Sequence, residues 1–186
     1  MDGLQRNFQE ALPPLSPYEA LVEANRCLFC FDAPCIRACP TGIDVPSFIL
    51  KIATSNLRGS ARVIMESNPL GATCARVCPV EALCEGGCVY NMQERQQIQI
   101  GQLQRHATDW LIDSGETTFV VGPDNGKNVA CIGSGPSSLA AAVRLRELGY
   151  SVTLYEAKPH GGGLGTYGIV SFRLPVEISL AEVGLV

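Results

Sequence analysis

Cysteine is the residue type that most clearly carries chemistry in this sequence of 186 residues, which contains nine cysteines. Eight of them lie in two groups, Cys27-x2-Cys30-x4-Cys35-x3-Cys39-Pro40 and Cys74-x3-Cys78-Pro79-x5-Cys84-x3-Cys88. Such a density predicts either a disulfide framework or a metal site. The N-terminus shows no secretory signal, so we expect a reducing compartment, and an odd number of cysteines fits complete pairing poorly. Both arguments favour metal.

The spacing of the cysteines narrows the kind of metal site. Structural zinc is usually held by two close pairs of ligands, whereas bacterial ferredoxins pack four cysteines into one short run that ends in Cys-Pro. From spacing alone, we therefore interpret the eight cysteines as ligands of two [4Fe–4S] clusters, with a zinc site and a disulfide framework as the alternatives. The ninth, Cys131, stands where a strand needs an apolar side chain, and we expect an inert buried thiol there.

A glycine-rich turn carries the second chemical signal. It is Gly133-Ser134-Gly135-Pro136-Ser137-Ser138, which has the first two glycines of the dinucleotide fingerprint and a serine in place of the third. A strand is predicted before the turn and a helix after it, and Glu156 ends the next strand 23 positions after Gly133, where the fingerprint places an acid that binds ribose. Gly161-Gly162-Gly163 offers a second close backbone approach. A plain turn without a ligand is the alternative.

Helices and short strands must position these residues. Capping signals and apolar periodicity predict helices that run from residue 17 to about 26, from 45, from 59, and from about 100 to 114. The first cysteine group, Cys27 to Cys39, is expected on irregular backbone after the first of these helices. After a linker at 122–126, a strand at 128–132, a helix at 137–148 and a strand at 151–155 predict a parallel β-α-β unit. We place the domain boundary near residue 120, which gives a helical domain at 1–120 and a Rossmann-like domain at 121–186.

The overall composition excludes several classes of protein. The sequence is 46% hydrophobic and 17% charged, with a net charge of −4, which is typical of a globular protein rather than a disordered or fibrous one. No apolar run approaches the length of about 18 residues that indicates a membrane-spanning helix. The mild acidity argues against nucleic-acid binding, which needs a clustered basic surface. We expect a cytoplasmic protein with no nucleic-acid or membrane partner.

Several strings of the sequence together resemble one known family. They are CLFCFDAPCIRACP, NPLGATCARVCPVEALCEGGC, IQIGQLQRHATDW, ACIGSGPSSLAAA and GIVSFRLP, and they extend over about residues 20 to 178. The sequence is similar to the N-terminal region of dihydropyrimidine dehydrogenases, in particular to the flavin and iron–sulfur subunit of the bacterial NAD-dependent form. The small subunit of glutamate synthase is a more distant relative, because its second cysteine block has a different spacing.

The resemblance implies that two [4Fe–4S] clusters draw their ligands crosswise from both cysteine groups. One cluster would be held by Cys27, Cys30, Cys35 and Cys88, and the other by Cys39, Cys78, Cys84 and Gln104. Cys74 matches a family cysteine that is not a ligand. Spacing alone uses eight cysteines, whereas the resemblance uses seven and a glutamine amide, and we follow the resemblance. Without it, Gln104 would be interpreted as a polar residue on a helix surface.

The resemblance also implies that the β-α-β unit binds FAD. The matching positions are Gly133, Ser134, Gly135, Pro136 and Ser137 in the turn, Glu156 after the second strand, Gly163 and Leu164 in the following loop, and Arg173 in Phe172-Arg173-Leu174-Pro175. Arg173 would neutralise pyrophosphate or flavin charge, and a surface ion pair is its alternative role. Gly168-Ile169-Val170-Ser171 departs from the Gly-Ile-Pro that is usual in the family, which affects the expected rigidity of that loop.

The implied function is electron transfer in an NAD(P)H-dependent oxidoreductase. Electrons would pass from NAD(P)H, bound by a domain that this chain lacks, through FAD and the two clusters to an FMN-containing partner subunit that reduces uracil or thymine. The chain ends after two strands of the flavin domain, so we expect a multi-domain protein with a truncated FAD-binding domain, inactive on its own. The alternatives are a glutamate-synthase-like subunit that feeds another partner, and a cluster-binding module that is not an enzyme. No catalytic acid or base is assigned.

Overall fold

The computed structural model describes residues 9–186. Residues 1–8, which contain the start of the expected helical domain and the stretch judged to lack a secretory signal, lie outside the described residues. The chain forms two compact units. The helical unit is Pro14–Thr118, and the β-α-β unit is Phe119–Val186 together with the described residues before Pro14.

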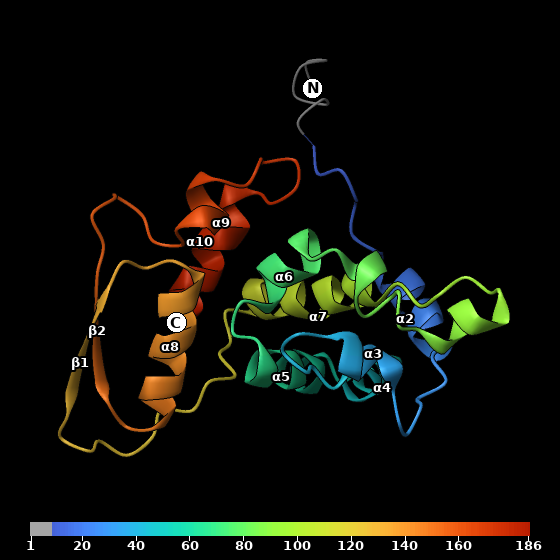
Figure 1. Ribbon diagram of the computed structural model, residues 1–186, viewed down its shortest axis with the longest axis horizontal. Coiled ribbons are helices and arrows are strands. Elements are labelled where there is room, and N and C mark those ends of the chain that lie inside the picture. Colours follow the sequence, from blue (N-terminus) through green and yellow to red (C-terminus); the bar gives the residue numbers. More distant parts are fainter. Residues whose placement is uncertain (1–8) are drawn as a thin grey trace. The chain divides into compact units, whose positions relative to one another are not determined.

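Helices are the regular secondary structure of the helical unit, as Figure 1 shows. In chain order they are α2 (Pro17–Asn25), α3 (Pro34–Ala38), α4 (Val45–Ala53), α5 (Leu57–Ser67), α6 (Gly71–Val77), the 3-10 helices η1 (Val80–Ala82) and η2 (Val89–Gln93), and α7 (Ile100–Ser114). The prediction of an N-terminal helical domain is thereby confirmed. In the described part of the chain, no helix combines the length and the apolar character needed to cross a membrane.

Local capping explains where several of these helices begin and end. Ser16 and Glu19 form a capping box at α2, in which the Glu19 carboxylate accepts from the Ser16 N–H at 2.8 Å and the Ser16 hydroxyl accepts from the Glu19 N–H. The Asp44 side chain accepts from the N–H of Ser47 and so caps α4. Gly115 ends α7 in a left-handed conformation, with φ of 65°, which glycine adopts without strain. These boundaries agree with the prediction.

The structure corrects two expectations about the helices. α5 begins at Leu57 rather than Gly59, because the Asn56 side chain accepts from the Gly59 N–H at 2.9 Å and caps the helix two residues earlier. The first cysteine group is not wholly irregular, because α3 lies within it, and α6, which carries Cys74 of the second group, has no predicted counterpart. Pro34 starts α3, and both helices are too short to show the apolar periodicity by which longer helices are recognised.

The core of the helical unit surrounds α7, which packs against α2, α4, α5 and α6. Phe48 and Ile49 of α4, Ile64 of α5 and Leu103 of α7 are completely buried. Five cysteines belong to this apolar cluster or pack against it: Cys27, Cys35, Cys39, Cys84 and Cys88. The thiols therefore adjoin the core, where water is scarce and charge is poorly solvated.

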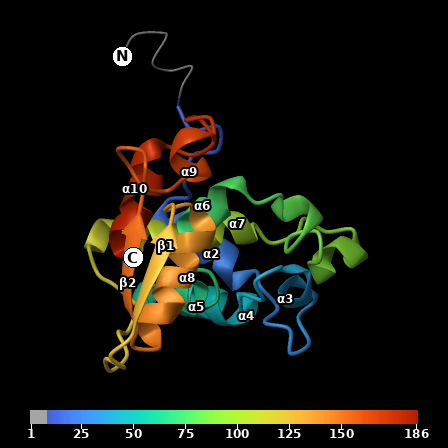
Figure 2. The same ribbon diagram turned by 60° about the vertical axis from the view of Figure 1, so that its left-hand side comes forward.

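The β-α-β unit contains β1 (Asn128–Ile132), α8 (Pro136–Glu147) and β2 (Ser151–Tyr155), followed by α9 (Leu164–Tyr167) and α10 (Val176–Leu185). The two strands pair in parallel, with Asn128 opposite Ser151 and Ile132 opposite Tyr155, as predicted. Figure 2 shows α8 lying along the strands, and it contacts both of them.

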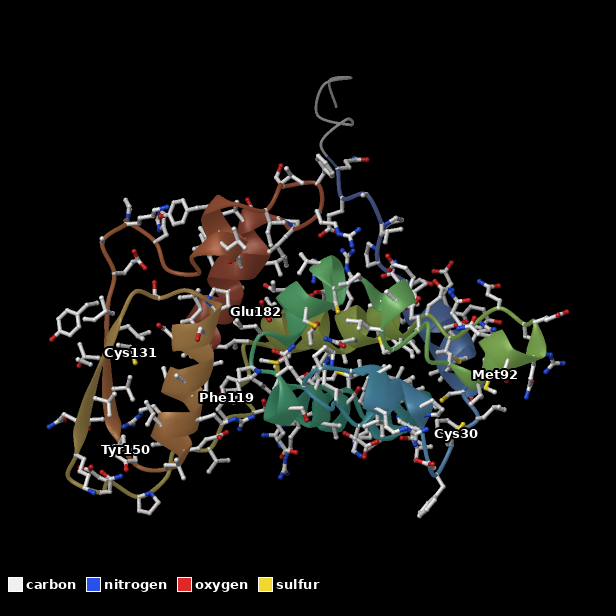
Figure 3. All side chains as sticks on the ribbon, in the orientation of Figure 1. Cys30, Met92, Phe119, Cys131, Tyr150 and Glu182 are labelled. Carbon is white, nitrogen blue, oxygen red and sulfur yellow. The ribbon has the colours of Figure 1, made fainter. Side chains whose placement is uncertain are left out.

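The residues of β1 alternate between a half-buried and an exposed face. Val129 and Cys131 are half-buried, whereas Ala130 and Ile132 are exposed, Ile132 to 82%. Cys131, labelled in Figure 3, is therefore only half-buried and not buried as expected. The reason is that a sheet of two strands is too narrow to enclose the side chains on its covered face.

Candidate functional site

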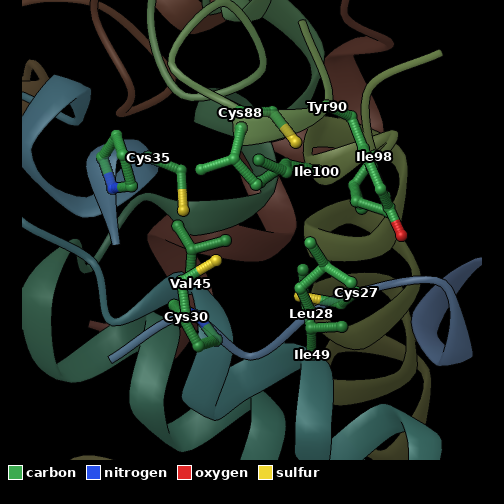
Figure 4. Close-up of a pocket in the computed structure, with 13 residues that line it drawn as sticks. Cys27, Leu28, Cys30, Cys35, Val45, Ile49, Cys88, Tyr90, Ile98 and Ile100 are labelled. Carbon is green, nitrogen blue, oxygen red and sulfur yellow. The ribbon is translucent and has the colours of Figure 1, made fainter. Parts of the chain in front are cut away.

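Four thiols line a hollow in the helical unit. They belong to Cys27, Cys30, Cys35 and Cys88, so both cysteine groups of the sequence contribute. Figure 4 shows these thiols spaced around the hollow, whose volume is about 370 Å³ including its open mouth. Most of the other lining residues are apolar, among them Leu28, Val45, Ile49, Val89, Ile98 and Ile100. The structure thus brings together the four predicted ligands of one cluster.

Local structure places these thiols around the hollow. Cys27 and Cys30 follow α2, and between them Phe29 takes a left-handed conformation with φ of 50° while its N–H donates to the Cys27 sulfur. Cys35 lies in the first turn of α3, and Cys88 immediately precedes η2. Burial raises the pKa of Cys27. Burial also raises the pKa of Cys35 to about 11, and the nearby Cys27 and Cys88 add to that rise.

A second set of thiols comprises Cys39, Cys74, Cys78 and Cys84, which lie close enough to influence one another's ionisation. Burial raises the pKa of Cys74 to about 12, and the neighbouring Cys78 adds to the rise. Burial, followed by repulsion from Glu85, raises the pKa of Cys84 to about 12. Burial also raises the pKa of Cys78, although a hydrogen bond with Cys74 opposes the rise. This set joins one cysteine of the first sequence group to three of the second.

Gln104 lies on α7 beside this second set. It is 6% exposed, and its amide nitrogen donates to the Gly71 carbonyl at 2.8 Å. Because a carbonyl oxygen can only accept, the amide nitrogen must face Gly71, and the amide oxygen of Gln104 remains to act as a ligand. The Gln104 side chain also hydrogen-bonds to Cys74. The structure therefore places the two candidates for the fourth ligand, Gln104 and Cys74, side by side.

Cys39 differs from the other thiols in its hydrogen bonds. Burial disfavours its thiolate, but the Thr41 hydroxyl and the backbone N–H groups of Ile43, Thr41 and Gly42 donate to the sulfur and together lower the pKa of Cys39 below its ordinary value. The Thr41 hydroxyl oxygen lies 3.5 Å from the Cys39 sulfur. The turn after Cys39 thus favours the thiolate form.

The cysteines are all free thiols. Within residues 9–186, no three His, Cys, Asp or Glu side chains converge closely enough to hold a single metal ion. The thiols instead form two separate sets, one around the apolar hollow and one beside Gln104.

The glycine-rich turn joins β1 to α8. Gly133 has φ of 83°, which favours glycine, and its N–H donates to the Tyr155 carbonyl at 2.7 Å. Glu156 is exposed after β2, and its carboxylate accepts from the N–H and the hydroxyl of Ser134 at 2.9 and 2.6 Å. The Ser134 hydroxyl, followed by the Lys158 N–H, lowers the pKa of Glu156 to about 2. The carboxylate next to the turn is therefore charged at neutral pH.

A second glycine loop lies against this turn. The Gly162 N–H donates to the Ser134 carbonyl at 2.8 Å, and a Cβ atom on Gly163 would lie only 2.7 Å from the Cα of Gly135, so a larger residue would clash there. The remaining predicted contacts are spread over other elements: Pro136 and Ser137 begin α8, Leu164 begins α9, and Arg173 is exposed between α9 and α10.

Three residues that shape these sites give little or no signal in the sequence. The carboxylates of Glu23 and Glu85 accept from the N–H groups of Gln99 and Gly101, both at 2.9 Å, and they cap α7, whose own capping residue makes no side-chain hydrogen bond. Such partners are distant in sequence, so no local motif reveals them. Thr41 carries only a weak signal, a hydroxyl residue two positions after a cysteine.

Comparison with known proteins gives two family matches and close relatives. Residues 4–116 match the family described as dihydropyrimidine dehydrogenase domain II, 4Fe-4S cluster, and residues 131–174 match the NAD(P)-binding Rossmann-like domain. The NAD-dependent dihydropyrimidine dehydrogenase subunit PreT of Escherichia coli O157:H7 is 44% identical over 180 residues. The PreT homolog of Salmonella typhi is 43% identical over 180 residues. Each alignment covers 96% of this chain but only 43% of the relative, so the chain spans less than half the length of these curated relatives.

Proposed function

The chain belongs to the dihydropyrimidine dehydrogenase domain II, 4Fe-4S cluster family, and from this premise we propose that it is the electron-transfer part of an NAD(P)H-dependent dehydrogenase. In this proposal, electrons pass from NAD(P)H through FAD and two [4Fe–4S] clusters to a partner subunit. The partner carries FMN and reduces a pyrimidine such as uracil or thymine. The protein contributes the placement of the cofactors and the tuning of their potentials.

The crossed assembly of the thiols is the observation that carries this proposal. Cys88 joins three cysteines of the first sequence group, and Cys39 joins cysteines of the second. In paired ferredoxin-type clusters, the last cysteine of one run commonly serves the other cluster. We therefore assign Cys27, Cys30, Cys35 and Cys88 to the first cluster, and Cys39, Cys78, Cys84 and Gln104 to the second cluster.

The donor chemistry of both sets fits iron–sulfur clusters. Thiolates are their usual ligands, and the bound clusters would accept and release single electrons. Ile49, Ile98 and Ile100 line the hollow of the first set and keep water away from its thiols. Because Cys35 and Cys84 have raised pKa values, they must release protons when iron binds, and this makes loading dependent on pH.

Gln104 is assigned as the fourth ligand of the second cluster in preference to Cys74. The hydrogen bond to Gly71 fixes the amide so that its nitrogen is occupied and its oxygen is available. Cys74 is hydrogen-bonded to Gln104 and also to Cys78, which is itself assigned as a ligand. In this arrangement, the Cys74 thiol supports a ligand sulfur and does not replace it.

The β-α-β unit is proposed to hold the FAD. The turn from Gly133 to Ser137, together with Gly163, offers bare backbone to a pyrophosphate at the start of α8. Glu156 is charged and can accept from ribose hydroxyls. Leu164 and Arg173 are proposed as further contacts, with the guanidinium of Arg173 offsetting pyrophosphate charge.

Anaerobic purification with counts of iron, acid-labile sulfide and zinc tests the cluster proposal. We expect about eight iron and eight sulfide per chain, as two cubane clusters require. The variant Cys131→Ser is the matched control, because Cys131 lies in the other unit, and it should keep the full count. A preparation that holds zinc and no labile sulfide would contradict the proposal.

Co-purification tests the proposed partner. A bound subunit that contains FMN and oxidises the reduced clusters when uracil or thymine is added would support the pyrimidine assignment. Electron delivery to a glutamate-forming subunit instead would favour the glutamate-synthase alternative. Full clusters without any flavin binding or NAD(P)H oxidation in the complete complex would favour the non-enzymatic module.

A further inference from the structure

The turn from Cys39 to Ile43 gathers hydrogen-bond donors around one sulfur. The backbone N–H groups of Thr41, Gly42 and Ile43 and the Thr41 hydroxyl donate to Cys39. Gly42 makes this possible, because its left-handed conformation, with φ of 66°, turns successive N–H groups to the same side, as in an anion-binding nest. Ile43 is 1% exposed and anchors the end of the turn in the core, so the donors are held in place.

The donor sets at Cys27, Cys35 and Cys84 are smaller. Cys27 accepts from one backbone N–H, that of Phe29, and Cys84 from one, that of Glu85. Cys35 accepts from its own N–H and that of Ile36. Thr41 is the side-chain donor of the Cys39 turn, and it is exposed, so its hydroxyl is not needed to fill the core.

Hydrogen bonds to ligand sulfurs favour the more negative, reduced form of a cluster and so raise its reduction potential. The second cluster receives these donors and, in place of a fourth thiolate, a neutral amide from Gln104. Both features act in the same direction. The half-buried carboxylate of Glu85 opposes them at Cys84, and that of Glu81 opposes them at Cys78. Glu85 also caps α7 and is partly neutralised there, and Glu81 is exposed, so water screens its charge.

Resting on the cluster assignment of the proposed function, we propose that the Cys39–Ile43 turn, with Thr41 as its side-chain donor, raises the reduction potential of the second cluster above that of the first. Thr41 is then a positioning and tuning residue, which acts on the cluster through Cys39. A single electron that enters the pair of clusters therefore reduces mainly the second cluster, because the first has the lower reduction potential.

The test uses the full chain with both clusters loaded, and compares Thr41→Val with Thr41→Ser in a redox titration monitored by electron paramagnetic resonance. Thr41→Val removes the donor at nearly constant volume. It should lower the potential of the second cluster by roughly 59 mV, the equivalent of a tenfold change in a one-electron equilibrium, and leave the first unchanged. Thr41→Ser should retain the original potentials. Thr54→Val is the matched control, because Thr54 is exposed and its hydroxyl donates to the Leu50 carbonyl.

Three other results would contradict the tuning role of Thr41 or the proposed function. Unchanged potentials in Thr41→Val, or equal shifts of both clusters, would overturn the tuning role while leaving the two-cluster assignment intact. If Thr41→Val and Thr41→Ala both lose the second cluster while Thr41→Ser keeps it, the hydroxyl has a structural role and the proposal is wrong. Absence of labile sulfide from the unmodified protein would instead overturn the proposed function itself.

Discussion

The two units of the chain differ in how far they bury their candidate ligand-binding residues. In the helical unit, Cys84, Cys88 and Gln104 are at most 9% exposed, and both cysteines belong to the apolar core around α7. In the β-α-β unit, Glu156 is exposed and Ile132, just before the glycine turn, is 82% exposed. The helical unit buries these three candidate ligands and half-buries the other five, whereas the β-α-β unit carries its candidate residues at the end of a two-stranded sheet.

This difference in burial reflects the different structural requirements of a cluster site and a nucleotide site. Cluster ligands come from several segments, so the site forms only where those segments pack into one core, and its formation depends on that core. A nucleotide site at a glycine turn needs only a strand, a turn and a helix to exist locally. Parallel sheets are normally covered on both faces, so a sheet with an exposed face gives a bound nucleotide little enclosure.

The largest expected effect distinguishes two cysteines of the second set in the helical unit. Cys78→Ser removes an assigned ligand and should cost one whole cluster, about four iron and four sulfide. Cys74→Ser should keep both clusters, because Cys74 is assigned as a supporting thiol. Iron and sulfide counts on anaerobic preparations measure both variants, and loss of a cluster from Cys74→Ser would restore the assignment of eight cysteine ligands.

The next effect compares the two units directly. The chain on its own should retain its clusters through gel filtration but lose added FAD, because the helical unit buries or half-buries its ligands whereas Pro136, Ser137 and Glu156 beside the glycine turn are exposed. Absorbance of the protein peak at flavin and cluster wavelengths, with flavin release measured by fluorescence, distinguishes the two cofactors. Tightly held FAD at one per chain would contradict the comparison.

A core substitution should destabilise the helical unit by about 3–5 kcal/mol. Phe48→Ala removes a completely buried ring of α4 and leaves a cavity in the cluster of side chains that also includes Cys84 and Cys88. Leu50→Ala, on the same helix and 46% exposed, is the matched control and should cost far less. Urea unfolding followed by the fluorescence of Trp110, the single tryptophan, reports on this unit. Equal losses in both variants would show that the core is not closed as described.

The sequence predicted the parts of the fold whose causes are local. Ser16 and Asp44 cap α2 and α4 through neighbours three positions away, and Gly115 ends α7 by its own conformation. The same holds for the parallel strands and the glycine turn, where strand, turn and helix follow one another. Asn56 caps α5 in the same way but lies before a segment of weak pattern, so that boundary was missed.

The candidate cluster sites could be predicted only in part, because their geometry is tertiary. Spacing identified which cysteines are candidates, and the last cysteine of a ferredoxin-type run commonly serves the other cluster, but spacing treated all eight as ligands and did not say which residues share a cluster. The residue-by-residue assignment depends on how distant segments pack, and it came from the family resemblance. The same holds for Gln104, whose orientation is fixed by a carbonyl 33 residues away, and for Glu85, which caps a helix from another segment.

A smaller effect concerns the charge of the second cluster. Gln104→Cys replaces a neutral amide by a thiolate, which adds negative charge and should make that cluster harder to reduce. Its potential should fall while that of the first cluster stays unchanged, in a titration followed by electron paramagnetic resonance. Gln102→Cys, two residues away on α7 and therefore on a different face, is the control and should shift neither. Unchanged potentials and spectra in Gln104→Cys would move the search for the eighth ligand to Cys74.

The smallest effect lies in the β-α-β unit and depends on pH. Glu156 has a pKa of about 2, below its ordinary value of 4.5, because the Ser134 hydroxyl and backbone N–H groups stabilise its charged form. A carboxyl whose pKa is lower in the folded state stabilises the fold above the unfolded pKa, and this contribution disappears as the pH falls toward the folded pKa. The difference in urea midpoint between the unmodified protein and Glu156→Gln should therefore be constant above about pH 5 and shrink between pH 4.5 and 2.

Two features keep this pH-dependent difference in stability small. Glu156 is exposed, so water screens its interactions, and the titration concerns one unit of the chain only. Circular dichroism of the strands, rather than Trp110 fluorescence, is the appropriate measurement, since the tryptophan lies in the helical unit. Ser134→Ala removes the strongest donor to the carboxylate and should reproduce the loss in the same pH range. A difference that does not vary with pH would mean that Ser134 and the backbone of the turn do not hold the Glu156 carboxylate. The β-α-β unit would then offer an exposed carboxylate that is not fixed in position, and it would differ from the helical unit in order as well as in burial.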